Sequence, residues 1–154
     1  IDSKKIIVFN LSKGRIGDDA SSLLGSIFMT SLGLAAFSRQ DTAEFMRRPF
    51  FIYADEFQNW TTLFLVNALS ELRKYKIGLI LANQYLDQIR KEIREAVLGN
   101  VGTMIVFRVG TRDARYFSKE FDENLSSSDI LAIPNGKCLI RILSFKILKI
   151  SLLI

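Results

Sequence analysis

The sequence predicts an α/β protein in which a mainly parallel sheet is flanked by helices. Short, solidly apolar runs alternate with longer segments of helical character along the chain. Connections of about a dozen or more residues join parallel strands, and strands without polar alternation are covered on both faces. With 154 residues, 49% of them hydrophobic, the chain is long enough for one globular domain with a real core.

The first predicted strand is the β-branched and aromatic run KIIVFNL at residues 5–11. The loop SKGRIGDDASS follows, and Asp19, Ser21 or Ser22 is expected to cap a helix that begins near Leu23. This helix, LLGSIFMTSLGLAAFSRQ, is apolar on nearly all sides. We therefore expect it to be largely buried.

The middle of the chain repeats the strand and helix pattern. Pro49 opens the apolar run PFFIYADEF, and Thr61 or Thr62 opens a helix over TTLFLVNALSELRKYK. The third strand is IGLILANQ, and the charged helix YLDQIRKEIREAVLG ends near Gly99. GTMIVFRVG is the fourth strand, and TRDARYFSKEF is a short helix.

The last apolar segment, CLIRILSFKILKISLLI, is predicted to form one or two strands. Arg141, Lys146 and Lys149 interrupt it, and it is shorter than the roughly 20 residues of a membrane-spanning helix. The alternatives are an amphipathic helix and a non-native end of the chain. We expect no membrane segment in this chain.

Two counts exclude whole classes of chemistry. The chain has no histidine and one cysteine, so it holds no Ser-His-Asp triad, no Cys-His pair and no ordinary zinc site. The single Cys138 is expected to be a small buried apolar residue. The net charge of +5 is compatible with nucleic acid or an anionic surface as partner.

Polar side chains follow each of the four predicted strands. In a parallel sheet all carboxyl ends meet at one edge, which is where ligands bind. These residues are Asn10, Asp55, Glu56, Asn83, Gln84 and Arg108.

The run FFIYADE is the strongest single motif. Apolar residues followed by Asp55 and Glu56 are the pattern of a Walker B strand in P-loop nucleotidases. There the aspartate binds Mg²⁺, directly or through water, and the glutamate polarises the attacking water. The alternative is a solvated strand end, or carboxylates that complement the dipole of the next helix.

Two further features fit nucleotide chemistry. Gln84 ends the next strand and has the donor and acceptor groups of a γ-phosphate sensor, although a satisfied amide in a turn explains it equally well. Arg108, Arg112 and Arg115 cluster after the fourth strand, where one could reach a phosphate in a neighbouring subunit. The alternative is local ion pairing with Asp113.

The motif GxxxxGK[ST] is absent from the sequence. Either the chain is the later half of an ATPase whose phosphate-binding loop lies upstream, or it binds no nucleotide. A metal-dependent nuclease using Asp18, Asp19, Asp55 and Glu56 is a weaker alternative, because the first two are better explained as helix capping. The basic helices interleave acids with bases, as solvated helix faces do.

As a set, these motifs resemble the carboxyl-terminal half of the motor domain in type IV secretion coupling proteins. The segments that carry the resemblance are KIIVFNLSKGRIG, RRPFFIYADEFQNW, LRKYKIGLILANQYLDQI, GNVGTMIVFRVGTRDARYF and SSSDILAIPNGKCLIRI. These proteins are conjugative DNA-transfer ATPases of the HerA/FtsK superfamily, and this region is called a TraM recognition domain. The resemblance covers roughly residues 3–142.

The resemblance implies half of a RecA-like P-loop NTPase domain over residues 1–142, followed by an apolar tail over 143–154. The parent protein would be a hexameric, ATP-driven pump for single-stranded DNA and its relaxase, at the cytoplasmic face of the cell membrane. Asp55 and Glu56 would be the Walker B pair, Gln84 the sensor and Arg108 an inter-subunit arginine. Mg²⁺ and ATP would bind the parent, and no cofactor is expected on this chain alone. The alternative is a non-catalytic docking module for relaxosome or accessory proteins.

Overall fold

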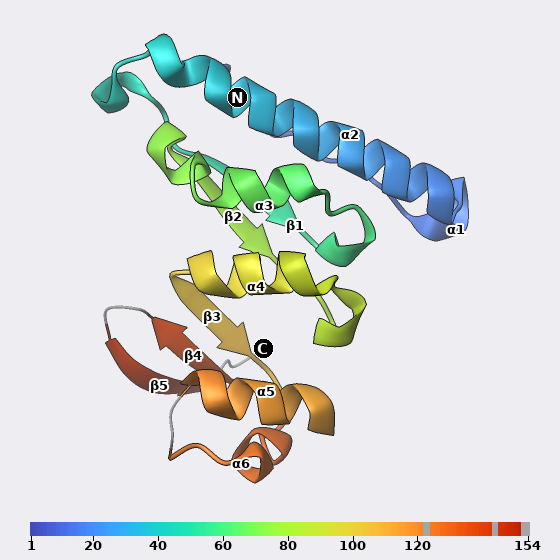
Figure 1. Ribbon diagram of the computed structural model, residues 1–154, viewed down its shortest axis with the longest axis vertical. Helices are drawn as coiled ribbons and strands as arrows, with labels where there is room; N and C mark the ends of the chain where they lie inside the picture. The colour runs from blue at the N-terminus through green and yellow to red at the C-terminus, as the bar shows by residue number, and fades with distance from the viewer. Residues whose placement is uncertain (122–123, 143–144, 152–154) are drawn as a thin grey trace. The chain divides into compact units, whose positions relative to one another are not determined.

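The computed structural model describes residues 1–121, 124–142 and 145–151, and it forms two compact units, Ile1–Asn100 and Val101–Ile154. Each unit is described by itself. Together they carry the alternating helices and strands of the predicted α/β class (Figure 1). Residues 143–144 and 152–154 of the predicted apolar tail lie outside the described residues.

The first unit contains a two-stranded sheet, its helices and several short 3₁₀ turns. The sheet consists of β1 (Phe50–Ala54) and β2 (Ile77–Leu81). The helices are α1 (Lys13–Ile16), α2 (Asp18–Phe37), α3 (Leu63–Leu69) and α4 (Lys91–Asn100). The 3₁₀ turns are η1 (Ser38–Asp41), η2 (Glu44–Met46), η3 (Phe57–Asn59), η4 (Leu72–Tyr75) and η5 (Leu86–Gln88). The helix predicted after β1 is thus divided into α3 and η4.

The two strands of this unit are parallel, as predicted, and pair from Phe50 with Ile77 to Ala54 with Leu81. The pairing continues past the strand ends. Ala82 N–H donates to Ala54 O at 2.9 Å, and Phe57 N–H donates to Ala82 O at 3.2 Å. These two bonds tie the chain after β1 to the chain after β2, so both strands end at the same edge.

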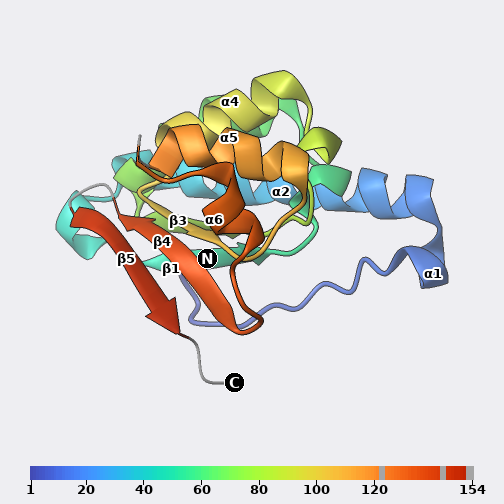
Figure 2. The same cartoon turned by 90° about the horizontal axis from the view of Figure 1, so that it is seen from below.

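Helix α2 packs through one face that carries small residues. An added Cβ would lie 2.7 Å from Trp60 at Gly25 and 2.3 Å from Phe64 at Gly33. The opposite side of α2 remains exposed, with Leu23 62% and Leu34 59% accessible. The expectation of a helix buried nearly all round is therefore wrong. Within the described residues α2 packs against α3 and η3 on one side (Figure 1), and its first turns extend past the sheet (Figure 2).

The start of α2 also differs from the prediction. The helix begins at Asp18, before Leu23, and its N-cap is Gly17 at φ 83°, a conformation that glycine adopts without steric cost. Ser21 and Ser22 lie inside the helix and bind other segments. The Ser21 hydroxyl donates to Leu11 O at 2.6 Å, and the Ser22 hydroxyl donates to Asn59 O at 2.7 Å.

Residues 5–11, predicted as an interior strand, do not form one in this structure. The segment is extended, and its apolar side chains Ile6 and Val8 are 94% and 86% exposed. A cavity lies between this segment and β1, and among the described residues the segment pairs with no strand. A β-branched run alone does not make a strand, because each strand needs a neighbour to pair with.

Arg39 fixes the end of α2 against the amino ends of both strands. Its side chain is 3% exposed and donates to Arg48 O at 3.0 Å and to Tyr75 O at 2.7 Å. Asp2 accepts from the same guanidinium at 2.7 Å and balances its charge. A buried cation is tolerated only when it is paired and hydrogen-bonded in this way.

The described residues of the second unit form a three-stranded antiparallel sheet and two helices. The strands β3 (Thr103–Val106), β4 (Lys137–Ile142) and β5 (Phe145–Ser151) lie in that order. The helices are α5 (Thr111–Phe121) and α6 (Ser127–Leu131), the second of which starts with a Ser126–Asp129 capping box. The pairing of β3 in this unit is therefore antiparallel, because β4 returns along it.

The core of the second unit forms between this sheet and its helices. β3 alternates buried Met104 and Val106 with exposed residues. Cys138 is buried in this core, as predicted. The remaining core side chains are Ala114, Phe117, Phe121, Ile130, Ile133 and Leu139.

Within the part of the chain that the structure describes, one helical segment, Asp18–Asp41, is long and apolar enough to cross a membrane by length and composition. Core helices of soluble proteins meet the same criterion. In this unit Gly25 and Gly33 bring the segment close to Trp60 and Phe64. It is therefore weak evidence for a membrane span.

We predict opposite effects of two glycine-to-alanine substitutions within helices. Gly33→Ala should lower the free energy of unfolding by about 1–3 kcal/mol, since the new methyl group overlaps the Phe64 ring. Gly99→Ala in α4 meets nothing within 4 Å and should raise it by about 0.5–1 kcal/mol through helix propensity. Urea unfolding of both variants measures the difference, and equal effects would contradict the close packing of α2.

Candidate functional site

The candidate site lies where β1 ends in two carboxylates. Asp55 is exposed, and one of its carboxylate oxygens accepts from the Glu56 N–H at 3.0 Å. Glu56 has a left-handed backbone, φ 50° and ψ 41°, which is unfavourable for a residue with a Cβ. This conformation turns the chain sharply into η3 and leaves both carboxylates at the carboxyl edge of the sheet.

The structure brings Gln84 to Glu56, although 28 positions separate them in the chain. The Gln84 side-chain amide donates to Glu56 Oε1 at 2.5 Å. The parallel pairing of β1 with β2 and the two Ala82 bonds bring these residues together. The common edge predicted from the sequence is confirmed for these residues of the first unit.

Two glutamines that sequence reasoning missed complete this cluster. Gln58 in η3 donates through its side-chain amide to Glu56 Oε2 at 2.5 Å. The same amide nitrogen donates to Gln88 Oε1, in η5, at 3.2 Å. The sequence signal was weak, since Gln58 and Gln88 follow the strand ends by several residues and glutamine is common in turns.

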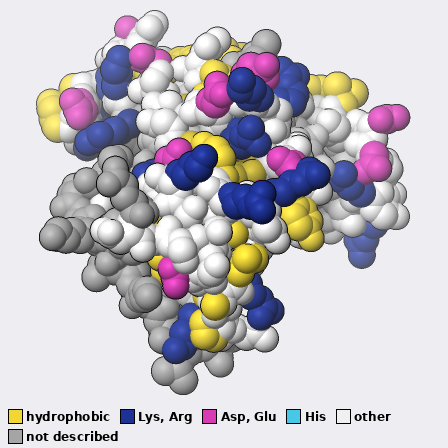
Figure 3. Space-filling view, turned by 60° about the horizontal axis from the view of Figure 1, so that its bottom comes forward, with side chains coloured by type: hydrophobic (Ala, Val, Ile, Leu, Met, Phe, Trp, Pro, Cys, Tyr) yellow, Lys and Arg dark blue, Asp and Glu magenta, His cyan; other side chains and the backbone are white. Residues whose placement is uncertain are grey.

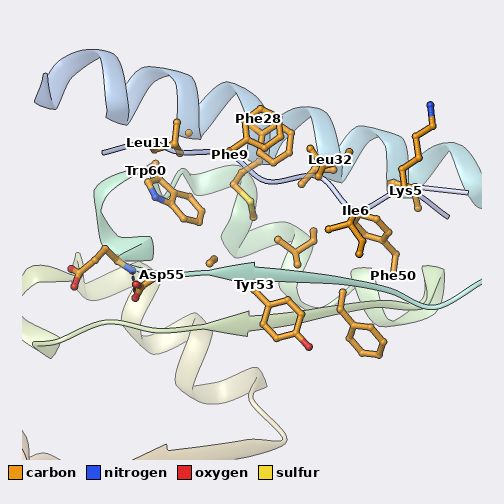
Figure 4. A pocket seen from close by; sticks show the side chains of 18 of the residues that line it. Lys5, Ile6, Phe9, Leu11, Phe28, Leu32, Phe50, Tyr53, Asp55 and Trp60 are labelled. Atoms are coloured by element: carbon orange, nitrogen blue, oxygen red, sulfur yellow. Dashed lines mark hydrogen bonds between the residues drawn. The ribbon is translucent and has the colours of Figure 1, made fainter. Parts of the chain in front are cut away.

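A large cavity reaches this edge from the side of the N-terminal segment. Its volume is about 880 Å³, and its walls come from residues 1–13, α2, β1 and the turn after β1. Figure 4 shows Phe9, Phe28 and Trp60 along the upper wall and Asp55 at one end. Asp55 and Glu56 therefore lie at one end of a half-open cavity.

The three candidate arginines belong to the second unit. Arg108 follows β3, is exposed, and donates to Asn135 Oδ1 at 2.9 Å. Arg112 and Arg115 lie exposed on α5, while Asp113 beside them is 6% exposed. The position of Arg108 at the same edge as Glu56 stays a prediction, because the units are not placed relative to one another.

The remaining acidic and amide candidates have other surroundings. Asp18 pairs with Lys13 at 2.9 Å, and Asp19 lies with it in the first turn of α2, where carboxylates complement the helix dipole. Asn10 accepts from the Ser12 N–H at 3.1 Å, before α1. These contacts give the nuclease alternative no support.

The side chains at the end of β1 fit Mg²⁺ as a partial ligand set. Among the described residues, no group of three or more acidic, His or Cys side chains could enclose a metal ion. Mg²⁺ is usually held by one or two carboxylates, with waters and substrate phosphates filling the other positions. Asp55, with Glu56 beside it, provides oxygen donors of that kind.

Charge on the visible surface is mixed. Figure 3 shows Lys and Arg side chains interspersed with Asp, Glu and apolar side chains on the face it presents. At the amino end of β2, away from the site, the hydrogen bond and charge of Glu71 raise the pKa of Lys74. This face gives no separate indication of a nucleic-acid surface.

Comparison with known families finds one match. The family described as the TraM recognition site of TraD and TraG matches residues 49–128, just over half of the chain. The matched segment includes Asp55, Glu56, Gln84 and Arg108. No curated protein matches the chain.

Solved structures share the fold at low sequence identity. Plasmid coupling protein TrwB with the GTP analogue GDPNP gives a TM-score of 0.68 at 15% identity, over 88% of this chain and 38% of TrwB. TrwB with ADP and Mg²⁺ gives 0.67 at 14% identity, over the same shares. The genome packaging NTPase B204 from Sulfolobus turreted icosahedral virus 2, with AMPPCP, gives 0.63 at 17% identity, over 84% of this chain and 62% of B204.

These similarities confirm the predicted α/β fold as that of part of a RecA-like NTPase. The chain spans less than two thirds of each matched structure.

We predict that the backbone strain at Glu56 can be measured by a pair of substitutions. Glu56→Gly and Glu56→Ala both remove the carboxylate and its hydrogen bonds, so their difference isolates the left-handed backbone. The glycine variant should be more stable by about 1 kcal/mol. At Gln58, where φ is not positive, the same pair should show the reverse order in urea unfolding. An alanine variant at position 56 as stable as the glycine variant would contradict the strained turn.

Proposed function

This chain belongs to the TraM recognition site family of the conjugative coupling proteins TraD and TraG, and we propose that it is part of an ATP-driven motor. In this proposal the motor is a homo-hexamer that moves single-stranded DNA, with its relaxase, toward a type IV secretion channel. The chain carries the Walker B and sensor residues, and a phosphate-binding loop lies in a preceding part of the parent protein. The parent acts in the cytoplasm, at the cytoplasmic face of the cell membrane.

The observation that carries this proposal is the hydrogen bond between Glu56 and Gln84 across the ends of two parallel strands. A carboxylate that polarises water and an amide that senses a γ-phosphate must lie side by side to act on one phosphoryl group. A solvated strand end would not require a second polar side chain from the neighbouring strand.

Each residue has a distinct task in the proposed reaction. Asp55 would hold Mg²⁺, which would supply positive charge to the phosphates when bound. Glu56 orients a water molecule and accepts its proton, and Gln84 donates to the γ-phosphate oxygens. Arg108 stabilises charge in the site of a neighbouring subunit.

A second candidate function is a non-catalytic docking module for relaxosome or accessory proteins. The description of the matching family as a TraM recognition site favours it. In that case the carboxylates at the end of β1 would have a structural role, and partner binding would not depend on them.

We predict that Glu56→Gln in the longer parent protein lowers kcat for ATP hydrolysis by about 10²-fold or more, because the amide cannot accept the proton from water. Nucleotide binding should remain. Glu71→Gln is the matched control, since Glu71 pairs with Lys74 at the opposite end of the sheet. Steady-state ATPase assays measure both. Full activity of Glu56→Gln with intact partner binding would favour the docking module.

We also predict that this 154-residue chain alone neither binds nor hydrolyses ATP. Its sequence has no GxxxxGK[ST] motif, and so no loop of backbone N–H groups to cradle the phosphates. A titration with labelled ATP should show no saturation. Saturable binding at low micromolar ATP would contradict a site that is completed by another part of the parent.

A further inference from the structure

We propose that Gln58 is a positioning residue for Glu56 and that Gln88 controls it from η5. The catalytic effect that we infer for Gln58 and Gln88 rests on the proposed function. We name the two side-chain amides that bind the Glu56 carboxylate, those of Gln58 and Gln84, the amide clamp. The existence of this clamp does not depend on the proposed function. Neither Gln58 nor Gln88 belongs to the Walker B pair or the sensor.

The amide clamp holds Glu56 by both carboxylate oxygens. Gln84 donates to Oε1 and Gln58 donates to Oε2. With both oxygens bonded, rotation of the carboxylate about its terminal torsion would break a hydrogen bond. Each carboxylate oxygen has a second lone-pair position, so the clamp fixes the direction of the carboxylate while leaving room for a water.

Gln58 is itself held from another segment of the chain. Its amide nitrogen donates to Gln88 Oε1 at 3.2 Å in addition to Glu56. Gln88 is the last residue of η5, which leads into α4. A movement of η5 would therefore reach the carboxylate through one side chain.

The side-chain oxygen of Gln58, Oε1, indicates that Gln58 does not stabilise the folded state. Gln58 Oε1 is buried and has no hydrogen-bond partner among the described residues. A buried polar atom without a partner destabilises the folded state. The side chain is thus placed for what its nitrogen binds, at a cost to the fold.

The catalytic test compares three glutamine-to-methionine variants in the longer parent protein. Methionine has a similar length but cannot donate a hydrogen bond. Gln58→Met should lower kcat for ATP about tenfold, with KM changed less than twofold, because the base is misoriented while the nucleotide still binds. Gln88→Met should lower kcat about threefold, and Gln40→Met, on η1, should have no effect.

The double variant and stability separate positioning from structure. If Gln88 acts through Gln58, the Gln58→Met/Gln88→Met variant should have the kcat of Gln58→Met alone. Gln58→Met should also unfold at a urea concentration no lower than that of the wild type. The proposal would be overturned if the two single-variant losses of kcat multiplied in the double variant, or if Gln58→Met left kcat unchanged. A loss of kcat that follows a loss of stability in Gln58→Met would also overturn it.

A second measurement tests the amide clamp apart from ATP hydrolysis. In this 154-residue chain, Glu56→Gln should shift the side-chain amide NMR signals of Gln58 and Gln84, and leave those of Gln40 in place. Unmoved Gln58 signals would overturn the clamp. A different pair of results is that the signals move in this chain while the Glu56→Gln variant of the parent hydrolyses ATP at the normal rate. That pair of results would refute the proposed function and the catalytic role of Gln58, and would retain the contact between Gln58 and Glu56.

Discussion

The parallel pairing of β1 with β2 is the constraint on which the candidate site depends. Its register places Ala54 beside Leu81, and the Ala82 bonds extend it past both strand ends. Neighbouring parallel strands end at the same edge of a sheet, so the Glu56 carboxylate after β1 and the Gln84 amide after β2 come within hydrogen-bond distance. A shift of one residue would turn every side chain of β1 to the other face and separate Glu56 from Gln84.

The rest of the first unit keeps this pairing in place at its two ends. At the amino end, the buried Arg39 guanidinium binds the backbone before β1 and before β2. At the carboxyl end, Ser22 on α2 binds Asn59 in η3, and Gly25 admits the Trp60 ring. One helix thus connects both ends of the sheet, which explains why it needs glycines on the packed face and tolerates apolar side chains on the other.

Local patterns predicted the elements that depend on local physics. β1, β2, β3 and α5 were predictable from apolar runs, charged faces and the residues that end them. Residues 5–11 were not, because a strand needs a partner and the neighbouring edge of β1 is separated from them by a cavity. The prediction that Ser21 or Ser22 caps α2 was also wrong, since their hydroxyls bind Leu11 and Asn59 instead of the helix end.

The sequence by itself determined the fold class, the lack of histidine ligands and bases in this chain, and the position of Asp55, Glu56 and Gln84 at strand ends. These follow from composition and from the geometry of parallel strands. Only the tertiary structure decided that Gln58 binds Glu56 and Gln88, and that Glu56 has a left-handed backbone. The contact between Gln58 and Gln88 depends on how closely the turns η3 and η5 approach one another. Three-dimensional packing sets that distance, and no periodic pattern in the sequence encodes it.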